Sequence, residues 1–278
     1  MENVTVAEEN TKYDSRNTCN ALIETATNKL IKGGKNTVIP NSVTSIESGA
    51  FYRCTSLTSI HIPSSITSIG GSEFAECSNL ISVSIDCSTI GEWFSRNTAI
   101  QEVTLGSTVT EIGKKAFYNC EGLVSITIPN SVTTIGDDAF YGCEELEEIN
   151  IPEGVTSIGN SSFSGCDALT TITIPSSVIS IGYNVFPSHL TKVTSKMMTP
   201  PSIPYGYYLG SVSKTILYVP DGCKDVYVST NGWNNFKEII EMNYDEVNMS
   251  IAKMRTYSSN YDLDFTDVTG LKAYIVSG

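Results

Sequence analysis

The chain has 278 residues, of which 40% are hydrophobic and 17% are charged, a composition that excludes an intrinsically disordered protein. Its 30 acidic residues outnumber the 17 basic ones and give a formal net charge of −13. This charge argues against nucleic acid and anionic membranes as partners, and it also favours the solubility of an elongated molecule. No apolar run approaches the roughly 18 residues that span a bilayer, so the sequence predicts no membrane insertion.

Residues 1–36 are predicted to form an irregular first unit. Met1, Val4 and Val6 follow the spacing Leu-x-x-Ile-x-Ile, which recurs further along the chain, with Met1 in the leucine position. This spacing predicts that the chain opens on a strand with nothing before it to cap it, and that more protein naturally precedes residue 1. Residues 1–9 contain neither a basic nor an apolar stretch, so we expect no signal peptide within this chain.

Residues 37–196 are dominated by an internal repeat, which is the strongest signal in the sequence. The complete unit is I-P-x-S-V-T-S-I-G-x-x-A-F-x-x-C-x-x-L-x-x-I-x, and its phenylalanines are separated by 23, 20, 23, 23, 23 and 23 residues: Phe51, Phe74, Phe94, Phe117, Phe140, Phe163 and Phe186. Five Ile-Pro pairs keep the same 23-residue rhythm, at Pro40, Pro63, Pro129, Pro152 and Pro175. The single interval of 20 indicates a degenerate unit around residues 86–94 that has lost three residues from its turns.

Each unit begins with a segment that predicts a half-buried strand. Leu123, Ile126 and Ile128 end in period-2 alternation, and Pro129 then removes a backbone donor and ends the strand. A single unit cannot bury its apolar side, so we expect the units to stack in parallel and in register, about 4.8 Å apart. The result would be an arc or a flattened solenoid.

The second half of the unit predicts a short return path to the next strand. Val132 and Ile135 give a second short apolar rung, and Gly136 is expected to adopt a backbone angle that other residues resist. The chain would then make about one helical turn that directs Phe140 and Cys143 into the core.

Over about residues 37–195 this consensus resembles the BspA-like class of leucine-rich repeats. The resemblance implies a repeat solenoid with a parallel β-sheet on one face, short strands or single helical turns on the other, and a C-terminal α/β cap. It also implies a cell-surface or secreted protein of the adhesion type, since known members are mostly surface or secreted proteins of anaerobic bacteria and some protozoan parasites. Residues 10–24 are similar to the longer, irregular units found inside such arrays.

Residues 197–243 are expected to close the array. Residues 199–204 contain three prolines and act as a rigid breaker, and residues 216–220 are predicted to form a last strand. Residues 223–227 and 233–240 are interpreted as a closing helix and an aromatic plug, which resembles the end-cap of BspA-like arrays. Residues 244–278 resemble the start of a β-rich module; one or two strands have no independent stability, so we expect this tail to be incomplete or to dock on the cap.

The cysteines and histidines could suggest chemistry, but their spacing favours structural roles. Five cysteines occupy one repeat position and predict a ladder of buried, reduced thiols: Cys54, Cys77, Cys120, Cys143 and Cys166. Cys19, Cys87 and Cys223 lie outside this ladder and are expected to be unpaired. No C-x-x-C pair and no catalytic motif accompanies His61 or His189, so we expect no metal, no cofactor and no enzymatic activity.

Two surfaces are candidates for a ligand. Strand alternation predicts an outward row on the sheet face: Ser59, His61, Ser82, Ser84, Glu102, Thr104, Ser125, Thr127, Glu148, Asn150, Thr171 and Thr173, continued by Lys192 and Thr194. This row is polar and nearly free of aromatic residues, which disfavours tight binding by the row alone. The turns carry Tyr52, Tyr118 and Tyr141, and the loop with Tyr205, Tyr207 and Tyr208 is the densest exposed aromatic candidate; partial packing against neighbouring turns is the alternative for these tyrosines.

An acidic cluster lies at Glu144, Glu145, Glu147, Glu148 and Glu153. It is interpreted as a solvated face, with contact to a basic partner or a divalent cation as the alternative. The aspartates of the tail lack the spacing of a calcium loop.

The leading hypothesis for function is a non-catalytic, surface-displayed module, monomeric in solution, that binds a protein or a glycan. The alternative is a spacer that holds another domain away from the cell and has no ligand of its own. The polar sheet face favours the spacer, and the family resemblance favours the adhesin.

Overall fold

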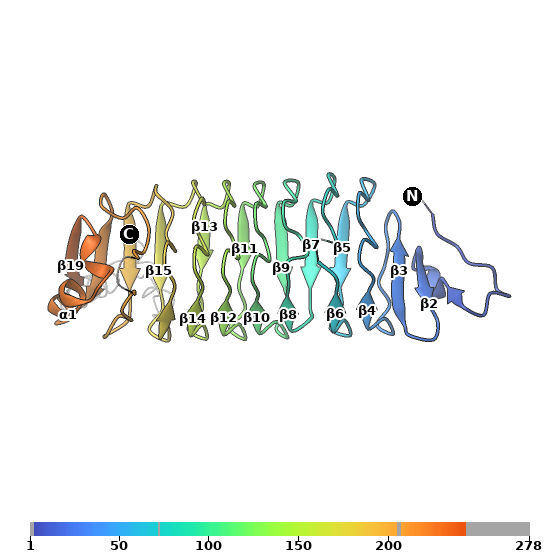
Figure 1. The fold of residues 1–278 in the computed structure, drawn as a ribbon, viewed down its shortest axis with the longest axis horizontal. Helices are drawn as coiled ribbons and strands as arrows, with labels where there is room; N and C mark the ends of the chain where they lie inside the picture. Colours follow the sequence, from blue (N-terminus) through green and yellow to red (C-terminus); the bar gives the residue numbers. More distant parts are fainter. Residues whose placement is uncertain (1–2, 72, 205–206, 243–278) are drawn as a thin grey trace, which may run out of the picture.

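The computed structural model describes residues 3–71, 73–204 and 207–242. The chain winds into an elongated solenoid whose rungs follow one another along the long axis in sequence order (Figure 1). Parallel, in-register strands line two sides of each coil, as the 23-residue period predicts. No helix in the described part of the chain is long and apolar enough to cross a membrane.

The main sheet is built from the Leu-x-x-Ile-x-Ile segments. Its first five strands pair in parallel: β5 (Ser59–Ile62), β7 (Ser82–Ile85), β9 (Glu102–Leu105), β11 (Ser125–Thr127) and β13 (Glu148–Asn150). A further set continues the same side of the molecule: β15 (Thr171–Ile174), β17 (Lys192–Ser195), β18 (Ile216–Pro220) and β19 (Glu238–Met242). Equivalent isoleucines pair across coils, for example Ile126 with Ile149, so the apolar side chains of the repeat form a continuous buried ladder.

A second row of two-residue strands returns the chain on the other side of each coil. These strands are β4 (Ser45–Ile46), β6 (Ser68–Ile69), β8 (Thr89–Ile90), β10 (Glu111–Ile112), β12 (Thr134–Ile135), β14 (Ser157–Ile158) and β16 (Ser180–Ile181). The row is divided between β6 and β8, which belong to different sheets. The division coincides with the short unit. In that unit Ile90 follows Ile85 by five positions, whereas in a complete unit the equivalent residue Ile135 follows Ile128 by seven.

Stacked aromatic rings fill the centre of the solenoid. The seven ladder phenylalanines are fully buried or nearly so, and consecutive rings from Phe51 to Phe163 stack with centroids 4.9 to 6.0 Å apart. In the short unit Trp93 occupies the position before the ladder phenylalanine, where three other units have alanine (Ala50, Ala116 and Ala139). Its buried indole packs edge-on against Phe94, at 6.3 Å between centroids.

The turns that contain the ladder phenylalanines differ from the sequence expectation in two ways. They are successive hydrogen-bonded turns, such as Tyr141 N to Asp138 O at 3.1 Å and Cys143 N to Phe140 O at 3.2 Å, rather than a helical turn. Gly136 does not adopt a left-handed angle; Asp138 does, with φ of 54°. Glycine is required at 136 because a Cβ there would lie 2.6 Å from the Lys114 backbone nitrogen of the previous coil.

The N-terminal segment is irregular and partly antiparallel. It comprises β1 (Tyr13–Asp14), the 3₁₀ helix η1 (Arg16–Thr18), β2 (Ala21–Glu24) and β3 (Lys29–Gly33). β1, β2 and β3 pair antiparallel, and β3 then joins β4 in parallel. The prediction of an opening strand was wrong for residues 3–6, which are not in a strand. Their backbone N–H groups donate hydrogen bonds to side chains instead, for example from Val6 N to Ser15 Oγ at 3.1 Å.

The cap contains one more strand than predicted. Helix α1 (Lys224–Ser229) and the 3₁₀ helix η2 (Trp233–Asn235) follow β18, as expected for a closing helix and an aromatic plug. The chain then re-enters the sheet as β19, parallel to β18, so residues 216–220 are not the last strand. Fully buried Trp233 packs at 5.2 Å and edge-on against Tyr227 and donates from Nε1 to Pro201 O at 2.8 Å. The expectations for residues 244–278 lie outside the described residues.

Candidate binding surfaces

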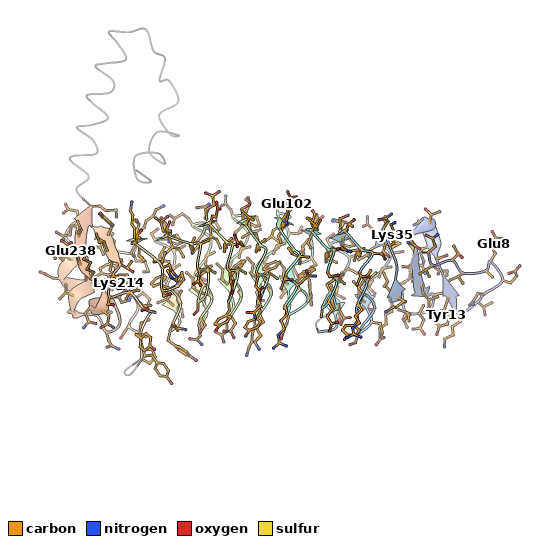
Figure 2. The ribbon with its side chains drawn as sticks, turned by 90° about the horizontal axis from the view of Figure 1, so that it is seen from above. Glu8, Tyr13, Lys35, Glu102, Lys214 and Glu238 are labelled. Carbon is orange, nitrogen blue, oxygen red and sulfur yellow. The ribbon has the colours of Figure 1, made fainter. Side chains whose placement is uncertain are left out.

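The outward row of the main sheet is polar and flat. In strands such as β5 and β9, exposed polar residues alternate with buried apolar ones, and Figure 2 shows Glu102 projecting from this face. All twelve predicted residues from Ser59 to Thr173 are exposed or half-buried. The predicted continuation of the row was wrong at Thr194, which is buried. Thr194 pairs in register with Tyr218 on β18, and the side chain of Tyr218 is larger than those at the same position of the earlier rungs.

Interactions on this face are local and link neighbouring rungs. His61 Nδ1 lies 3.1 Å from Ser84 Oγ, and its Nε2 lies 3.7 Å from Asp86 Oδ2. Lys192 Nζ lies 5.1 Å from the centre of the Tyr218 ring. Nothing among the described residues of the face forms a concave or aromatic site.

The acidic cluster is a solvated surface. Glu144, Glu145, Glu147 and Glu148 are exposed, and Glu153 pairs with Lys196 at 3.0 Å. Within the described ranges no group of three or more His, Cys, Asp or Glu side chains is arranged to hold a metal ion.

The eight cysteines are all free and buried. In four ladder positions the thiol donates to the carbonyl of a phenylalanine in the previous coil, at 3.1 to 3.3 Å: Cys77 to Phe51, Cys120 to Phe94, Cys143 to Phe117 and Cys166 to Phe140. Burial raises the pKa of the Cys120 and Cys166 thiols to about 12. The predicted ladder of reduced, buried thiols is thus confirmed in geometry, and these thiols are not arranged as nucleophiles.

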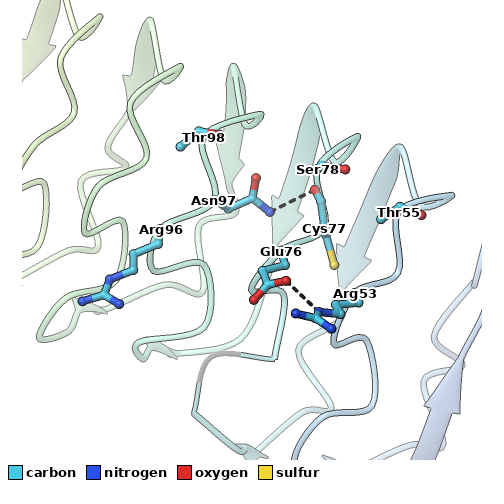
Figure 3. A pocket seen from close by; sticks show the side chains of 8 residues that line it. All are labelled: Arg53, Thr55, Glu76, Cys77, Ser78, Arg96, Asn97 and Thr98. Atoms are coloured by element: carbon cyan, nitrogen blue, oxygen red, sulfur yellow. Dashed lines mark hydrogen bonds and ion pairs between the residues drawn. The ribbon is translucent and has the colours of Figure 1, made fainter.

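A hollow of about 490 Å³ lies beside the short unit. Figure 3 shows that Arg53 is paired with Glu76, at 2.7 Å, while Arg96 is directed away from this pair. Asn97 occupies the cysteine position of the short unit and donates to the carbonyls of Phe74 and Cys77, at 3.0 and 3.3 Å. The two guanidinium groups do not converge, so the hollow lacks the geometry of an anion site.

Exposed and half-buried tyrosines gather on one edge of the solenoid. We call it the turn edge and define it as the turns between each second-row strand and its ladder phenylalanine, together with the residue after that phenylalanine. Tyr118 and Tyr141 stack there at 5.1 Å, with Lys115 Nζ 5.3 Å from the Tyr118 ring. Tyr183 packs against Tyr207 of the cap loop, with ring centroids 4.6 Å apart and the ring planes tilted by 33°. Tyr183, Tyr207 and Tyr208 are 38, 52 and 56% exposed, whereas Tyr205 lies outside the described residues.

The cap loop continues the turn edge as the next rung. Asn184 N donates to Tyr208 O at 2.6 Å and Phe186 N donates to Leu209 O at 2.8 Å, as backbone groups do between ordinary coils. Gly210 closes this rung with φ of 137°, and a Cβ there would lie 2.3 Å from Phe186 O. The sequence predicted the exposed tyrosines of the loop but not the contact with Tyr183; the only signal was that Tyr183 lies 23 and 46 residues after Asn160 and Asp137, in the same repeat position.

Parallel, in-register coils with one buried ladder and a closing cap define a leucine-rich-repeat solenoid. The match to the BspA type leucine rich repeat region extends over residues 31–121 and 88–200, with six copies, and covers more than half of the sequence. The chain therefore belongs to the BspA-type leucine-rich-repeat family, as the consensus predicted.

Several solved structures are similar in fold. A leucine-rich repeat protein from Eubacterium ventriosum ATCC 27560 is 23% identical, with a TM-score of 0.47; the match covers 59% of this chain and 52% of that protein, so the chain spans about half of its length. The T. pallidum Leucine Rich Repeat protein is 21% identical over 80% of this chain and 94% of its own, with a TM-score of 0.41. A leucine rich cell surface protein from Faecalibacterium prausnitzii A2-165 is 20% identical over 87% and 96%, with a TM-score of 0.35. No curated protein matches the chain.

Proposed function

We propose that this chain is a non-catalytic, surface-displayed module of the adhesion type, monomeric in solution, that binds a protein or a glycan on another surface. Membership of the BspA-type family supports this role. Catalysis, metal binding and a cofactor form no part of the proposal, since the buried thiols and locally paired histidines serve packing and rung-to-rung contacts.

The observation that carries the proposal is the exposed tyrosine group at the cap end of the turn edge. Tyr183, Tyr207 and Tyr208 keep a large part of their surface accessible on backbone that is hydrogen-bonded to the core. Tyrosine provides a large, stiff contact surface with a polar tip, and it is enriched where proteins bind ligands tightly. Such residues on a rigid support lose little conformational freedom on binding.

A spacer without a ligand is the second candidate. The observation that favours it is the main sheet face, whose outward residues are short and polar and make contacts mainly with their neighbours. A face of this kind keeps the array soluble without attracting a partner.

Binding screens on the intact chain separate the two candidates. The labelled protein is applied to arrays of glycans and of extracellular proteins, and its adhesion to cultured cells is measured in parallel. We expect saturable binding to at least one ligand class, with the unlabelled chain competing for the same sites. Absence of binding on both arrays and on cells would favour the spacer.

A further inference from the structure

Successive turns present a strip of residues whose chemistry changes along the solenoid. A glycine follows each of the second-row strands β10, β12, β14 and β16, and the two positions after it carry, coil by coil, Lys114–Lys115, Asp137–Asp138, Asn160–Ser161 and Tyr183–Asn184. The cap loop adds Tyr207–Tyr208. The strip is charged at its first two rungs and neutral from Asn160 onward. This neutral section lies within a chain of net charge −13.

Hydrogen bonds hold the strip in place. Asn160 N donates to Asp137 Oδ1 at 2.7 Å, and Tyr183 N donates to Asn160 Oδ1 at 3.1 Å, so each side chain binds the backbone of the next rung. This side-chain ladder ends at Tyr183, which carries a ring in place of the carboxylate or amide and packs against Tyr207. The backbone that carries the Tyr183 ring is thus held in place before any ligand arrives.

Unused polar groups lie beside the rings. Asn184 Nδ2 is bound to Ser164 Oγ at 3.2 Å, which leaves Asn184 Oδ1 as an acceptor. Among the described residues, Asn160 Nδ2 and Ser161 Oγ have no hydrogen-bond partner, and neither residue is buried. Donors and acceptors therefore flank the Tyr183–Tyr207 pair on neighbouring rungs.

We propose that the section Asn160, Ser161, Tyr183, Asn184, Tyr207 and Tyr208 is a binding site for a neutral saccharide chain. A pyranose ring presents an apolar C–H face to an aromatic ring and hydroxyl groups to amides and hydroxyls at its edge, which is the combination found here. The coil spacing is close to the length of one sugar residue, so a chain laid along the axis meets one rung per sugar. The inference rests on the proposed binding function and specifies its ligand class.

The size and the charge of the section favour a saccharide over a protein. A protein interface of ordinary size uses about 20–30 residues on each side, whereas this section has six, bounded by charged rungs on one side. It carries no charge that would steer or select a charged partner. A short neutral ligand that combines stacking with a few hydrogen bonds fits these limits.

The test uses the intact chain and defined tetrasaccharides of β-1,4-linked glucose, β-1,4-linked N-acetylglucosamine, α-1,4-linked glucose and α-linked mannose. Binding is measured by isothermal titration calorimetry, with a uronic-acid-containing tetrasaccharide as the charged comparison. We expect one or more neutral tetrasaccharides to bind and the charged one to bind less well. Tyr183→Ala and Tyr207→Ala should each raise Kd at least tenfold, and Tyr183→Phe no more than about threefold, because it keeps the ring.

The matched control is Tyr118→Ala/Tyr141→Ala, which removes the stacked tyrosine pair elsewhere on the turn edge. This variant should leave Kd unchanged. Melting temperatures are recorded for all variants. Retention of saccharide binding in Tyr183→Ala/Tyr207→Ala would overturn the assignment of the site. If no tetrasaccharide binds but the chain binds a protein or cells, the saccharide inference fails and the proposed function stands. If neither sugars, proteins nor cells are bound, both fail.

Discussion

At the scale of single residues, the cysteine ladder combines burial with a directed hydrogen bond. Each of the four thiols that bond across coils points to a phenylalanine carbonyl that also accepts a backbone N–H of its own turn, as Phe117 O does from Cys120 N at 3.1 Å. The thiol therefore adds a contact between coils without being the sole partner of the carbonyl. Asn97 makes the same connection in the short unit with two bonds, which explains why this rung tolerates a polar residue.

This geometry predicts the behaviour of the thiols. At pH 8 a thiol reagent should leave the ladder cysteines of the native protein unmodified and react with all of them after denaturation, because the thiols are buried. For Cys120 and Cys166 burial also raises the thiol pKa to about 12, which keeps these two thiols protonated. Cys143→Ser should destabilise the fold by only about 1 kcal/mol, since Phe117 O offers the new hydroxyl a partner. Rapid modification of the native ladder would contradict the structure.

Glu73 is the residue whose position conflicts most with its chemistry. It is fully buried at a position where three other units have alanine (Ala50, Ala116 and Ala139), and its Oε2 accepts from Gly49 N while Oε1 has no partner among the described residues. Burial raises the pKa of Glu73, and the nearby charge of Glu47 acts in the same direction, while Lys32 and the backbone N–H bonds oppose it. The folded state therefore binds the proton of this carboxyl more tightly than the unfolded chain does.

A pH-dependent stability follows. Because the folded pKa exceeds the unfolded one, the stabilisation is present below the unfolded pKa and is lost as pH rises through the folded pKa. Glu73→Gln should remove this dependence, so the stability of the wild type relative to the variant should rise as pH falls from 7 to 4. Thermal unfolding of both proteins across this range measures the effect; parallel pH profiles would refute it.

At the scale of elements, the cap covers the last rungs of the array. β18 and β19 continue the main sheet. Tyr227 of α1 is buried in the cap together with Trp233 and Phe236. Tyr227 OH donates to Met197 O at 2.8 Å, so the cap is joined to the preceding irregular segment as well as to the sheet.

Removal of residues 218–242 should cause self-association, because it exposes the edge of β17 and the apolar interior of the last coil. Light scattering is expected to show oligomers for this deletion and a single species for a chain that ends at Met242. Trp233→Ala should leave the oligomeric state unchanged and lower the free energy of unfolding by about 3–5 kcal/mol. A monomeric, cooperatively melting deletion protein would show that the array is closed in some other way.

At the scale of the whole molecule, the features that could be predicted from the sequence are those that repeat with the 23-residue period. Parallel pairing, the buried phenylalanine and cysteine ladders and the outward polar row all follow from equivalent positions in adjacent coils. The predictions failed or were incomplete where the period ends. β19 lacks the Leu-x-x-Ile-x-Ile spacing, and Thr194 is buried because the next rung carries Tyr218.

The candidate site illustrates the same limit. The exposed loop tyrosines were predicted from composition, but their contact with Tyr183 depends on how an irregular loop of proline, glycine and tyrosine returns to the edge. That path is set by backbone bonds to Asn184 and Phe186 rather than by a periodic spacing. Sequence reasoning could therefore place the aromatic residues on the correct end of the molecule without assembling them into one surface.

The ladder contacts have an evolutionary consequence. Most contacts that hold one coil to the next join residues about one unit apart, as in the stack of Phe117 on Phe140 and the pairing of Ile135 with Ile158. A duplicated unit would meet the same partners on both sides and need no new kind of contact. Gain or loss of whole units therefore changes the reach of the molecule by about 4.8 Å each, while both ends and the surfaces that they carry are inherited intact.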